Sequence, residues 1–171
     1  MSKIIAIATN DVEDIELSSP VKKLKEAGHT VDLVEKQAGR QIIGKHGNKF
    51  DVDKSIDGLK ISDYDALLIP GGFSPDQLRA DDRFVDLVKD FLLANKPVFA
   101  VCHGPQLFIQ AGLASELTLT AYLTVRRDLY YAGARVKDEP VVIDKKHDLI
   151  TSRTPADLDA FNTAIIDRLA N

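Results

Sequence analysis

The chain has 171 residues, of which 44% are hydrophobic and 28% charged, and its formal net charge is −4. This length favours a single domain, spanning residues 1–171, with a hydrophobic core of its own. The mild negative charge and the lack of any basic run argue against nucleic acid or an anionic membrane surface as a partner. The apolar stretch at the N-terminus is too short for a signal peptide or a membrane span, so we expect a cytoplasmic protein. One cysteine excludes an internal disulfide and a cysteine-rich zinc site, and we expect neither metal nor cofactor.

Short apolar runs alternate with amphipathic stretches along the chain. Four runs are rich in β-branched residues and predict buried strands: Lys3–Ala8, Thr30–Val34, Ala66–Ile69 and Val98–Val101. Three stretches have helical spacing: Glu13–Ala27, Asp82–Asn95 and Pro105–Ala111. Three residues stand where helix C-termini are expected: Gly28, Asn95 and Gly112. This alternation predicts an α/β fold with a mostly parallel sheet covered on both faces.

Two regions depart from that alternation. Gln41–Asp53 predicts two short strands around a glycine-rich turn, and Pro140–Ser152 predicts a hairpin with its turn at residues 144–148. A last helix is expected from about Pro155 to Leu169. Pro20 lies inside the first helical stretch, where we expect it to kink the helix or delay its start.

The most informative segment surrounds Cys102. The strand that ends at Val101 leads directly into Cys102, and Gly104-Pro105 then opens a helix, which is the pattern of a nucleophile elbow. A thiol at a helix N-terminus should have a pKa below its free value of about 8.5. The alternative is that Cys102 is a small buried hydrophobic residue at the end of a strand.

Neighbouring residues extend this candidate site. His103 cannot simply face the preceding Cys102, but its ring could hold the thiolate, and its backbone N–H could point into the site. Gly71 and Gly72 follow a buried strand, so the amides of Gly72 and His103 could form an oxyanion hole. The alternatives are an ordinary turn at the two glycines and a solvent-facing histidine.

An acidic loop follows the first strand. The helix macrodipole is sufficient to explain Asp11, Glu13 and Asp14. Glu16 comes later and could approach the same edge of the sheet. Its carboxylate would oppose thiolate formation, so Glu16 helps only if burial raises its pKa and it donates a hydrogen bond to sulfur.

Several segments together resemble the ThiJ/PfpI family, within the class I glutamine-amidotransferase-like superfamily. They follow in order over nearly the whole chain: ATNDVEDIELSSP, IIGKHG, LLIPGGFSPDQLR, AVCHGPQLFIQAG, the region around Tyr122, and ITSRTPADL. The resemblance implies a flavodoxin-like three-layer α/β/α sandwich with a mostly parallel central sheet. It also implies an oligomer, either a dimer or a hexamer.

The resemblance assigns roles to individual residues. Cys102 would be the nucleophile, Glu16 its hydrogen-bonded acid, and Glu13, Gly71 and Tyr122 would line the pocket. His103 would pair with an acid from a neighbouring subunit, which here is Asp76, although many relatives carry the longer Glu. Tyr122 is followed by Leu123-Thr124 where relatives have Pro-Gly, so the pocket wall should differ. Phe73 and Leu78 flank Asp76, and we expect both to be buried between subunits.

The remaining histidines receive smaller roles. Glutamine amidotransferases complete their triad with a His-x-Glu, whereas His147 is followed by Asp148 and Leu149. We therefore expect His147 on the surface, in the hairpin turn. His29 fits an ordinary helix-end residue, and His46 has no assigned role.

Three functions remain open. In the first, Cys102 attacks the aldehyde of methylglyoxal and Glu16 moves a proton between the two carbons, without glutathione, as a glyoxalase III or deglycase in stress defence. In the second, a Cys102–His103–Asp76 triad across subunits hydrolyses peptides or amides. In the third, Cys102 is a peroxide-sensitive thiol in a non-enzymatic stress protein or holdase.

Overall fold

A central sheet of seven strands runs in the order β10-β11-β7-β6-β1-β2-β5, and every pairing is parallel except that of β10 with β11. The computed structural model describes all 171 residues. The strands of this sheet are β1 (Lys3–Ile7), β2 (Thr30–Glu35), β5 (Lys54–Ser55), β6 (Ala66–Ile69), β7 (Val98–Val101), β10 (Val141–Asp144) and β11 (Leu149–Ser152). Two small pairs lie outside it: β3 (Gln41–Ile43) with β4 (Lys49–Asp51), and β8 (Thr118–Leu119) with β9 (Arg135–Val136).

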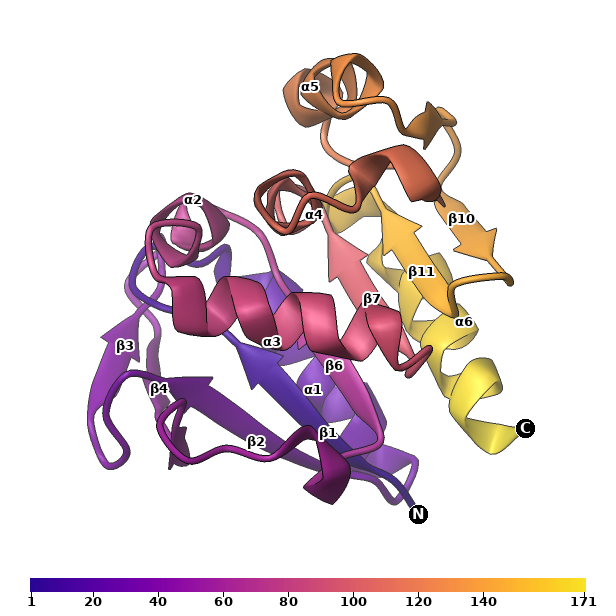
Figure 1. Cartoon of the computed structure of the whole chain (residues 1–171). Coiled ribbons are helices and arrows are strands. Elements are labelled where there is room, and N and C mark those ends of the chain that lie inside the picture. The colour runs from indigo at the N-terminus through magenta and orange to yellow at the C-terminus, as the bar shows by residue number, and fades with distance from the viewer.

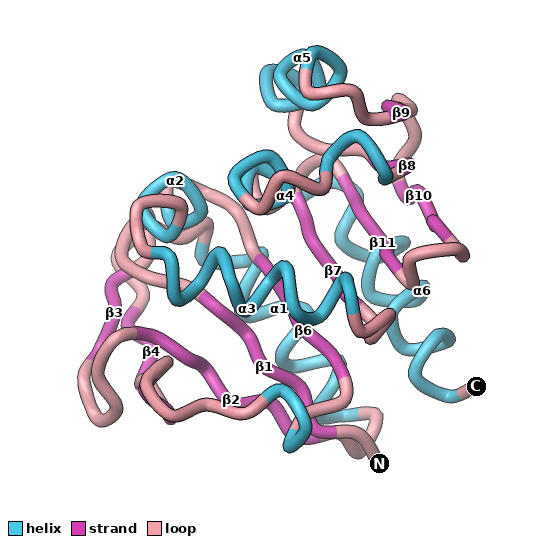
Figure 2. Tube along the Cα trace, in the orientation of Figure 1, coloured by secondary structure: helices cyan, strands magenta, loops and turns pink.

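Helices cover both faces of the sheet (Figure 1, Figure 2). The helices α1 (Asp14–Glu26) and α6 (Leu158–Ala170) pack on one face and contact each other. The opposite face carries α2 (Ser74–Leu78), α3 (Asp82–Leu93), α4 (Gln106–Gln110) and α5 (Leu123–Tyr131). Short 3-10 turns occupy Ile61–Asp63, Ala114–Glu116 and Pro155–Asp157. None of the helices has both the length and the apolar character that crossing a membrane requires.

The core is divided by the sheet into two clusters. In β1, Ile5 and Ile7 belong to the cluster under α3, whereas Ile4 and Ala6 belong to the cluster under α1 and α6. Successive side chains of a strand point to opposite faces, so a strand buried on both faces has a continuous apolar sequence. This confirms the predicted three-layer sandwich and explains why the apolar runs do not alternate with polar residues.

Most expected elements are confirmed within one or two residues at each end. Gly28, Asn95 and Gly112 all follow helices with positive φ, at 87°, 52° and 72°, as expected of helix C-termini. The two hairpins and the last helix are also confirmed. The expectation that Pro20 delays the first helix is wrong, because α1 begins at Asp14 and continues through it. The proline removes one backbone donor, but it is buried against the sheet, and packing keeps the helix intact.

The sequence did not predict several short elements, namely α2, α5, β5, β8 and β9. Each is either brief or dominated by exposed residues, so its hydrophobic period is weak. The helix α5 matters most for function, because Tyr122 directly precedes it.

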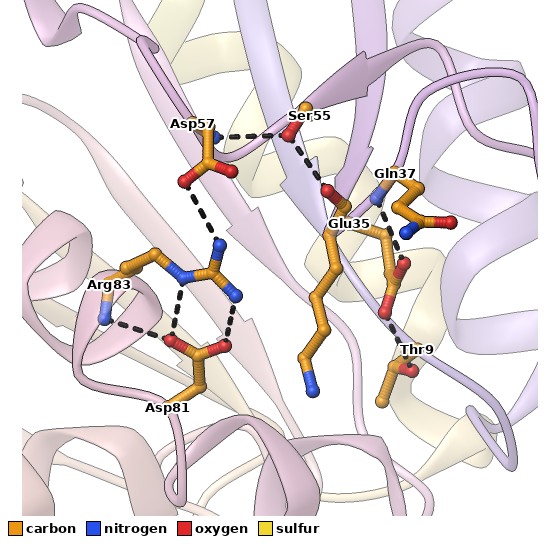
Figure 3. A network of polar contacts seen from close by, with 8 residues as sticks. Thr9, Glu35, Gln37, Ser55, Asp57, Asp81 and Arg83 are labelled. Carbon is orange, nitrogen blue, oxygen red and sulfur yellow. Dashed lines mark hydrogen bonds and ion pairs between the residues drawn. The ribbon is translucent and has the colours of Figure 1, made fainter.

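A polar network fastens the loop after β5 to the start of α3 (Figure 3). Arg83 donates to Asp81 at 2.7 Å and to Asp57 at 2.9 Å, and Asp81 caps the helix by accepting from the Arg83 amide at 3.1 Å. Figure 3 also shows Glu35 accepting from the Thr9 hydroxyl, at 3.3 Å. The Arg83 contacts thus tie the loop after β5 to α3, and the Thr9–Glu35 hydrogen bond joins the ends of β1 and β2.

Candidate active site

Cys102 occupies a sharp turn between β7 and α4. In Figure 1, β7 runs toward α4. Its φ is 61°, a left-handed conformation that a residue other than glycine rarely adopts. The Cys102 amide donates to Ser152 at 3.0 Å, and the Gly104 amide donates to Val101 at 2.9 Å. A Cβ atom on Gly104 would lie 2.5 Å from the Ile69 carbonyl oxygen, so only glycine allows this close approach. These features confirm the predicted elbow.

The di-glycine loop after β6 is tied to the acidic loop after β1. The Glu13 amide donates to the Gly71 carbonyl at 3.2 Å, and Val12 forms an isolated β-bridge with Gly72. Gly72 has a φ of 72°, and a Cβ atom there would lie 2.3 Å from the Glu13 nitrogen. The turn is therefore more than an ordinary connection, because its glycines let two loops meet beside Cys102.

Glu16 is the buried acid of the site. It is fully buried, and its Oε1 accepts from the Gly71 amide at 3.0 Å. Its Oε2 has no partner with hydrogen-bond geometry, while the carboxyl and the Cys102 thiol are close enough for each to shift the pKa of the other. Burial raises the pKa of Glu16 to about 7, against the lowering effect of the nearby Cys102 thiol and of the hydrogen bond from the Gly71 amide. The raised pKa that the sequence argument required is present.

The thiol itself does not behave as predicted. Burial, followed by the charge and hydrogen bonding of Glu16, raises the pKa of Cys102 above its ordinary value. The amides of His103 and Gly72 act in the opposite direction but do not outweigh these causes. The prediction that the helix N-terminus lowers the pKa of Cys102 is therefore wrong. The helix after Cys102 is a short one that begins only at Gln106, so its macrodipole is weak at the sulfur.

His103 lies against the thiol. Its Nδ1 is 3.2 Å from Cys102 Sγ, although the sequence argument held that consecutive residues cannot simply face each other. The positive φ of Cys102 makes this contact possible. The ring stacks on Tyr122, with centroids 4.8 Å apart and planes at 24°. Burial, and then the charge of Lys45, lowers the pKa of His103, while Asp76 opposes that effect.

Asp76 lies on α2 of the same chain and lines the same cavity as His103. No hydrogen bond joins the two side chains within this chain, so Asp76 acts on His103 through its charge. The flanking residues behave differently from each other. Phe73 is 58% exposed, whereas Leu78 is only 1% exposed and packs in the chain's own core. The expectation that Leu78 is buried between subunits is wrong, because its side chain is on the inner face of α2.

A loop at residues 44–48 closes one side of the site. The buried Asp14 carboxylate accepts from the His46 amide at 2.8 Å, and from the amide and side chain of Asn48 at 3.0 and 2.9 Å. Glu13 lies 2.9 Å from His46 Nε2 and 3.3 Å from Lys45 Nζ. Asp14 is therefore an anchor for the loop as well as an acid in the first turn of a helix, and His46 gains a role in holding Glu13.

One group of side chains has the spacing of a metal site. Ligand atoms of Glu13, Asp14 and His46 lie within 4.8 Å of one another. Both Asp14 oxygens already accept hydrogen bonds from the loop, and Glu13 is paired with Lys45. The contacts of this group are thus those of a structural clamp.

A cavity of about 720 Å³ opens above the thiol. It brings together all but one of the residues predicted for the site: Glu13, Glu16, Gly72, Asp76, Cys102, His103 and Tyr122. The exception is Gly71, which lies behind the wall, where a Cβ atom would meet Glu16 Oε1 at 2.5 Å. Five further residues line the cavity that were not predicted from the sequence to do so: Asp11, Lys45, Phe73, Gln106 and Pro155. All five are next to predicted residues or within the segments that carry the family resemblance, which is the signal that could have found them.

Two other features lie away from this cavity. A larger groove, of about 1140 Å³, is lined by residues of β10, β11 and α6, and no cysteine or histidine lines it. His147 is not on the surface as expected, because its side chain is only 17% exposed and its Nδ1 lies 2.9 Å from Asp144 Oδ2. Asp144 also accepts from backbone amides of the turn, so the pair organises the hairpin. His29 accepts from the Ser2 amide at 3.0 Å, which is consistent with a structural role.

The fold and the site define a class of α/β proteins with a cysteine at the strand-to-helix elbow and a buried glutamate beside it. A family model described as DJ-1/PfpI matches residues 2–168, and the chain belongs to this family. The chain is 51% identical over 170 residues to the "Putative cysteine protease YraA" of Bacillus subtilis, with 99% of each chain covered. It is 50% identical over 164 residues to the "Protein/nucleic acid deglycase 2" of Escherichia coli, with 95% of each covered.

A solved structure agrees closely with the fold. It is a two-domain protein of Anabaena variabilis with DJ-1/ThiJ/PfpI-like and ferritin-like domains, 36% identical, with a TM-score of 0.95. The alignment covers 99% of this chain and 48% of that one, so the match is to one of its two domains.

Proposed function

We propose that the protein is a cofactor-independent cysteine enzyme that converts methylglyoxal, free or attached to an amine or thiol, into a hydroxyacid. The observation that carries this proposal is Glu16, fully buried beside Cys102, with a pKa of about 7 and one oxygen that has no partner. A group that titrates near neutral pH can both donate and accept a proton within one catalytic cycle. Defence against reactive carbonyl compounds is the proposed physiological role.

The first step forms a bond between sulfur and carbon. The Cys102 thiol gives its proton to the Glu16 carboxylate, the sulfur attacks the aldehyde carbon, and Glu16 passes the proton to the carbonyl oxygen. This gives a hemithioacetal and leaves Glu16 as a carboxylate. This transfer allows a thiol of raised pKa to react, because the thiolate forms only as its proton moves to Glu16, and the protonated carboxyl then places no charge beside the sulfur. The amides of Gly72 and His103 face the sulfur and are positioned to stabilise the developing oxyanion.

The second step moves a proton between carbons. The Glu16 carboxylate removes the proton from the carbon bonded to sulfur and returns it to the neighbouring carbon. The hydroxyl proton on the first carbon passes to the oxygen on the second, so the first carbon gains the carbonyl and the second gains the hydroxyl group. The product is a thioester of lactate on Cys102. Water then adds to the thioester, the S–C bond breaks, and lactate and the free thiol are released. Where an amine adduct is the substrate, the sulfur displaces the amine, the C–N bond breaks, and Glu16 passes the thiol proton to the leaving amine.

A second candidate function is hydrolysis of peptides or amides. It is favoured by the two amides that face the sulfur and by His103, whose ring lies 3.2 Å from the thiol. Asp76 of a neighbouring subunit would complete this triad. We prefer a glyoxalase or deglycase, because peptide hydrolysis by the triad gives Glu16 no role in proton transfer.

The test is formation of D-lactate from methylglyoxal without glutathione or added metal. Wild type, Cys102→Ala and Glu16→Gln are compared, with thermal unfolding as the control for folding. We expect lactate from the wild type alone. No lactate from any of the three would contradict the proposal. A panel of peptide substrates, with Cys102→Ala as the control, then tests the peptidase. Oxidation of Cys102 by peroxide in the same preparation tests a redox-sensing role.

A further inference from the structure

Carboxylates dominate the charge of the active-site cavity. Asp11, Glu13 and Asp76 all line it, and Lys45 is the one lysine or arginine that does so. Glu13 neutralises the charge of Lys45, because the two side chains form an ion pair at 3.3 Å. Asp11 and Asp76 take part in no ion pair, so their charges are uncompensated at the mouth of the cavity.

His103 does not offset these charges. Its pKa is lowered, chiefly by burial, so the ring is neutral at pH 7. Glu16 adds a further negative charge whenever it is ionised. A ligand that reaches Cys102 therefore passes at least two carboxylates that have no counter-ion. Both residues are exposed, so their effect on an approaching anion is long-range and weakens as salt is added.

We propose that Asp11, together with Asp76, makes Cys102 selective for uncharged and cationic electrophiles and disfavours anionic ones. The consequence for natural substrates rests on the proposed function: carbonyl compounds that carry a carboxylate or a phosphate would be poor substrates. The charge selectivity of the Cys102 thiol toward electrophiles does not depend on whether the protein turns over a substrate. Asp11 is a specificity-determining residue in this proposal, because it repels an anion without taking part in bond formation.

The backbone at Asp11 allows a clean test. Its φ is 62°, its amide donates to Ile43 at 2.9 Å, and its carbonyl accepts from Phe73 at 2.9 Å. Asparagine tolerates this left-handed conformation as aspartate does, so Asp11→Asn removes the charge and keeps the loop. The matched control is Asp86→Asn, an exposed position on α3 that gives the same change in net charge away from the cavity.

The experiment uses two alkylating reagents of similar size, neutral iodoacetamide and anionic iodoacetate. The chain has one cysteine, so the gain in mass reports Cys102 alone. The quantity compared is the alkylation rate with iodoacetamide divided by the rate with iodoacetate. The fraction of thiolate cancels in this ratio, because both reagents react with the same thiolate. We expect the ratio in wild type to exceed that of free cysteine about fivefold at low salt, and to fall as salt is added.

The variants decide which residue is responsible. Asp11→Asn should lower the ratio about twofold, and Asp86→Asn should leave it unchanged. A wild-type ratio equal to that of free cysteine would overturn the proposal, and so would an Asp11→Asn ratio equal to that of wild type.

Measurement of kcat/KM with two substrates tests the charge selectivity independently of alkylation. Phenylglyoxal and 4-carboxyphenylglyoxal differ by one carboxylate, and we expect a lower kcat/KM for the second. Asp11→Asn should narrow this difference about twofold, the same factor as for alkylation. If neither compound is turned over while the alkylation ratio behaves as expected, the proposed reaction is wrong and the charge selectivity holds. If both compounds are turned over equally, the selectivity is wrong and the reaction holds.

Discussion

Cys102 Sγ lies 3.2 Å from Nδ1 of His103, the very next residue in the chain. The contact depends on the left-handed backbone at Cys102, whose φ is 61°. The Tyr122 amide donates to the Cys102 carbonyl at 2.9 Å, and the Tyr122 ring stacks on His103. The turn is therefore fixed from a distant segment, and it holds the thiol and the imidazole together.

The first prediction concerns the strain at this turn. A left-handed conformation costs a residue other than glycine roughly 1–2 kcal/mol. Cys102→Gly should therefore be more stable than Cys102→Ala by about 1 kcal/mol, although both lack the thiol. Urea unfolding of the two variants measures the difference. If Cys102→Gly were the less stable of the two, the turn would not be strained.

The second prediction concerns stability against pH. The folded-state pKa of Glu16, about 7, is above the model value of 4.5, because burial disfavours its charge. The folded protein therefore binds this proton more tightly than the unfolded chain. The contribution to stability is fully present below pH 4.5 and is lost as the pH rises through 7, with an upper limit of about 3 kcal/mol.

Glu16→Gln isolates this effect. His29 and His103 have lowered pKa values and act in the opposite sense in part of the same range, so the wild-type curve alone is ambiguous. The free energy of unfolding should be measured from pH 5 to pH 8 for both proteins. We expect the difference, wild type minus variant, to decrease with increasing pH. A difference that stays constant would mean that Glu16 is already ionised at pH 5.

The third prediction concerns Gly71. A Cβ atom there would lie 2.5 Å from Glu16 Oε1 and 2.9 Å from Cys102 Cβ. Gly71→Ala should therefore displace Glu16 and abolish more than nine-tenths of any Cys102-dependent activity, on the order of the loss for a mispositioned catalytic group. Gly39→Ala controls for a general loss of stability, because its φ of 79° strains an alanine there while nothing lies within 4 Å of the added Cβ atom. Full activity in Gly71→Ala would show that the carboxyl position is not critical.

The fourth prediction concerns the loop at residues 44–48. Asp14 accepts three hydrogen bonds from His46 and Asn48, so Asp14→Ala leaves two backbone amides of the loop without their acceptor. We expect a loss of about 2–4 kcal/mol in the free energy of unfolding and faster amide hydrogen exchange at residues 44–48. Asp51→Ala serves as an exposed control nearby. Unchanged exchange at these residues would show that Asp14 does not anchor the loop.

The fifth prediction concerns assembly. Phe73 is 58% exposed beside Asp76, at the mouth of the cavity, and we propose that a second copy of the chain covers it. The solution mass at micromolar concentration should then exceed that of a monomer, and Phe73→Ser should shift it toward the monomer. Phe73 lies in the turn before α2, where the backbone tolerates serine. A wild-type monomer at this concentration would also exclude a triad shared between subunits.

The sequence alone determined the main strands and helices of this protein, but not its short elements. Strands buried on both faces have continuous apolar runs, helix C-termini carry Gly28 and Gly112, and Gly104-Pro105 after a strand predicts the elbow. Each of these signals is local, because the conformation of a turn or cap depends on residues adjacent to it. The resemblance to a known family added the assignment of Glu16 and Tyr122 to the same pocket.

The tertiary structure decided the chemistry of the side chains. The amide that binds Glu16 belongs to Gly71, far along the chain, and burial by several elements is what raises the Glu16 pKa to about 7. The same burial raises the pKa of Cys102, which a local argument from a helix N-terminus predicted to fall. Leu78 turned inward while Phe73 remained exposed. A pKa and an exposed fraction depend on every group within a few ångströms, and only the folded chain brings those groups together.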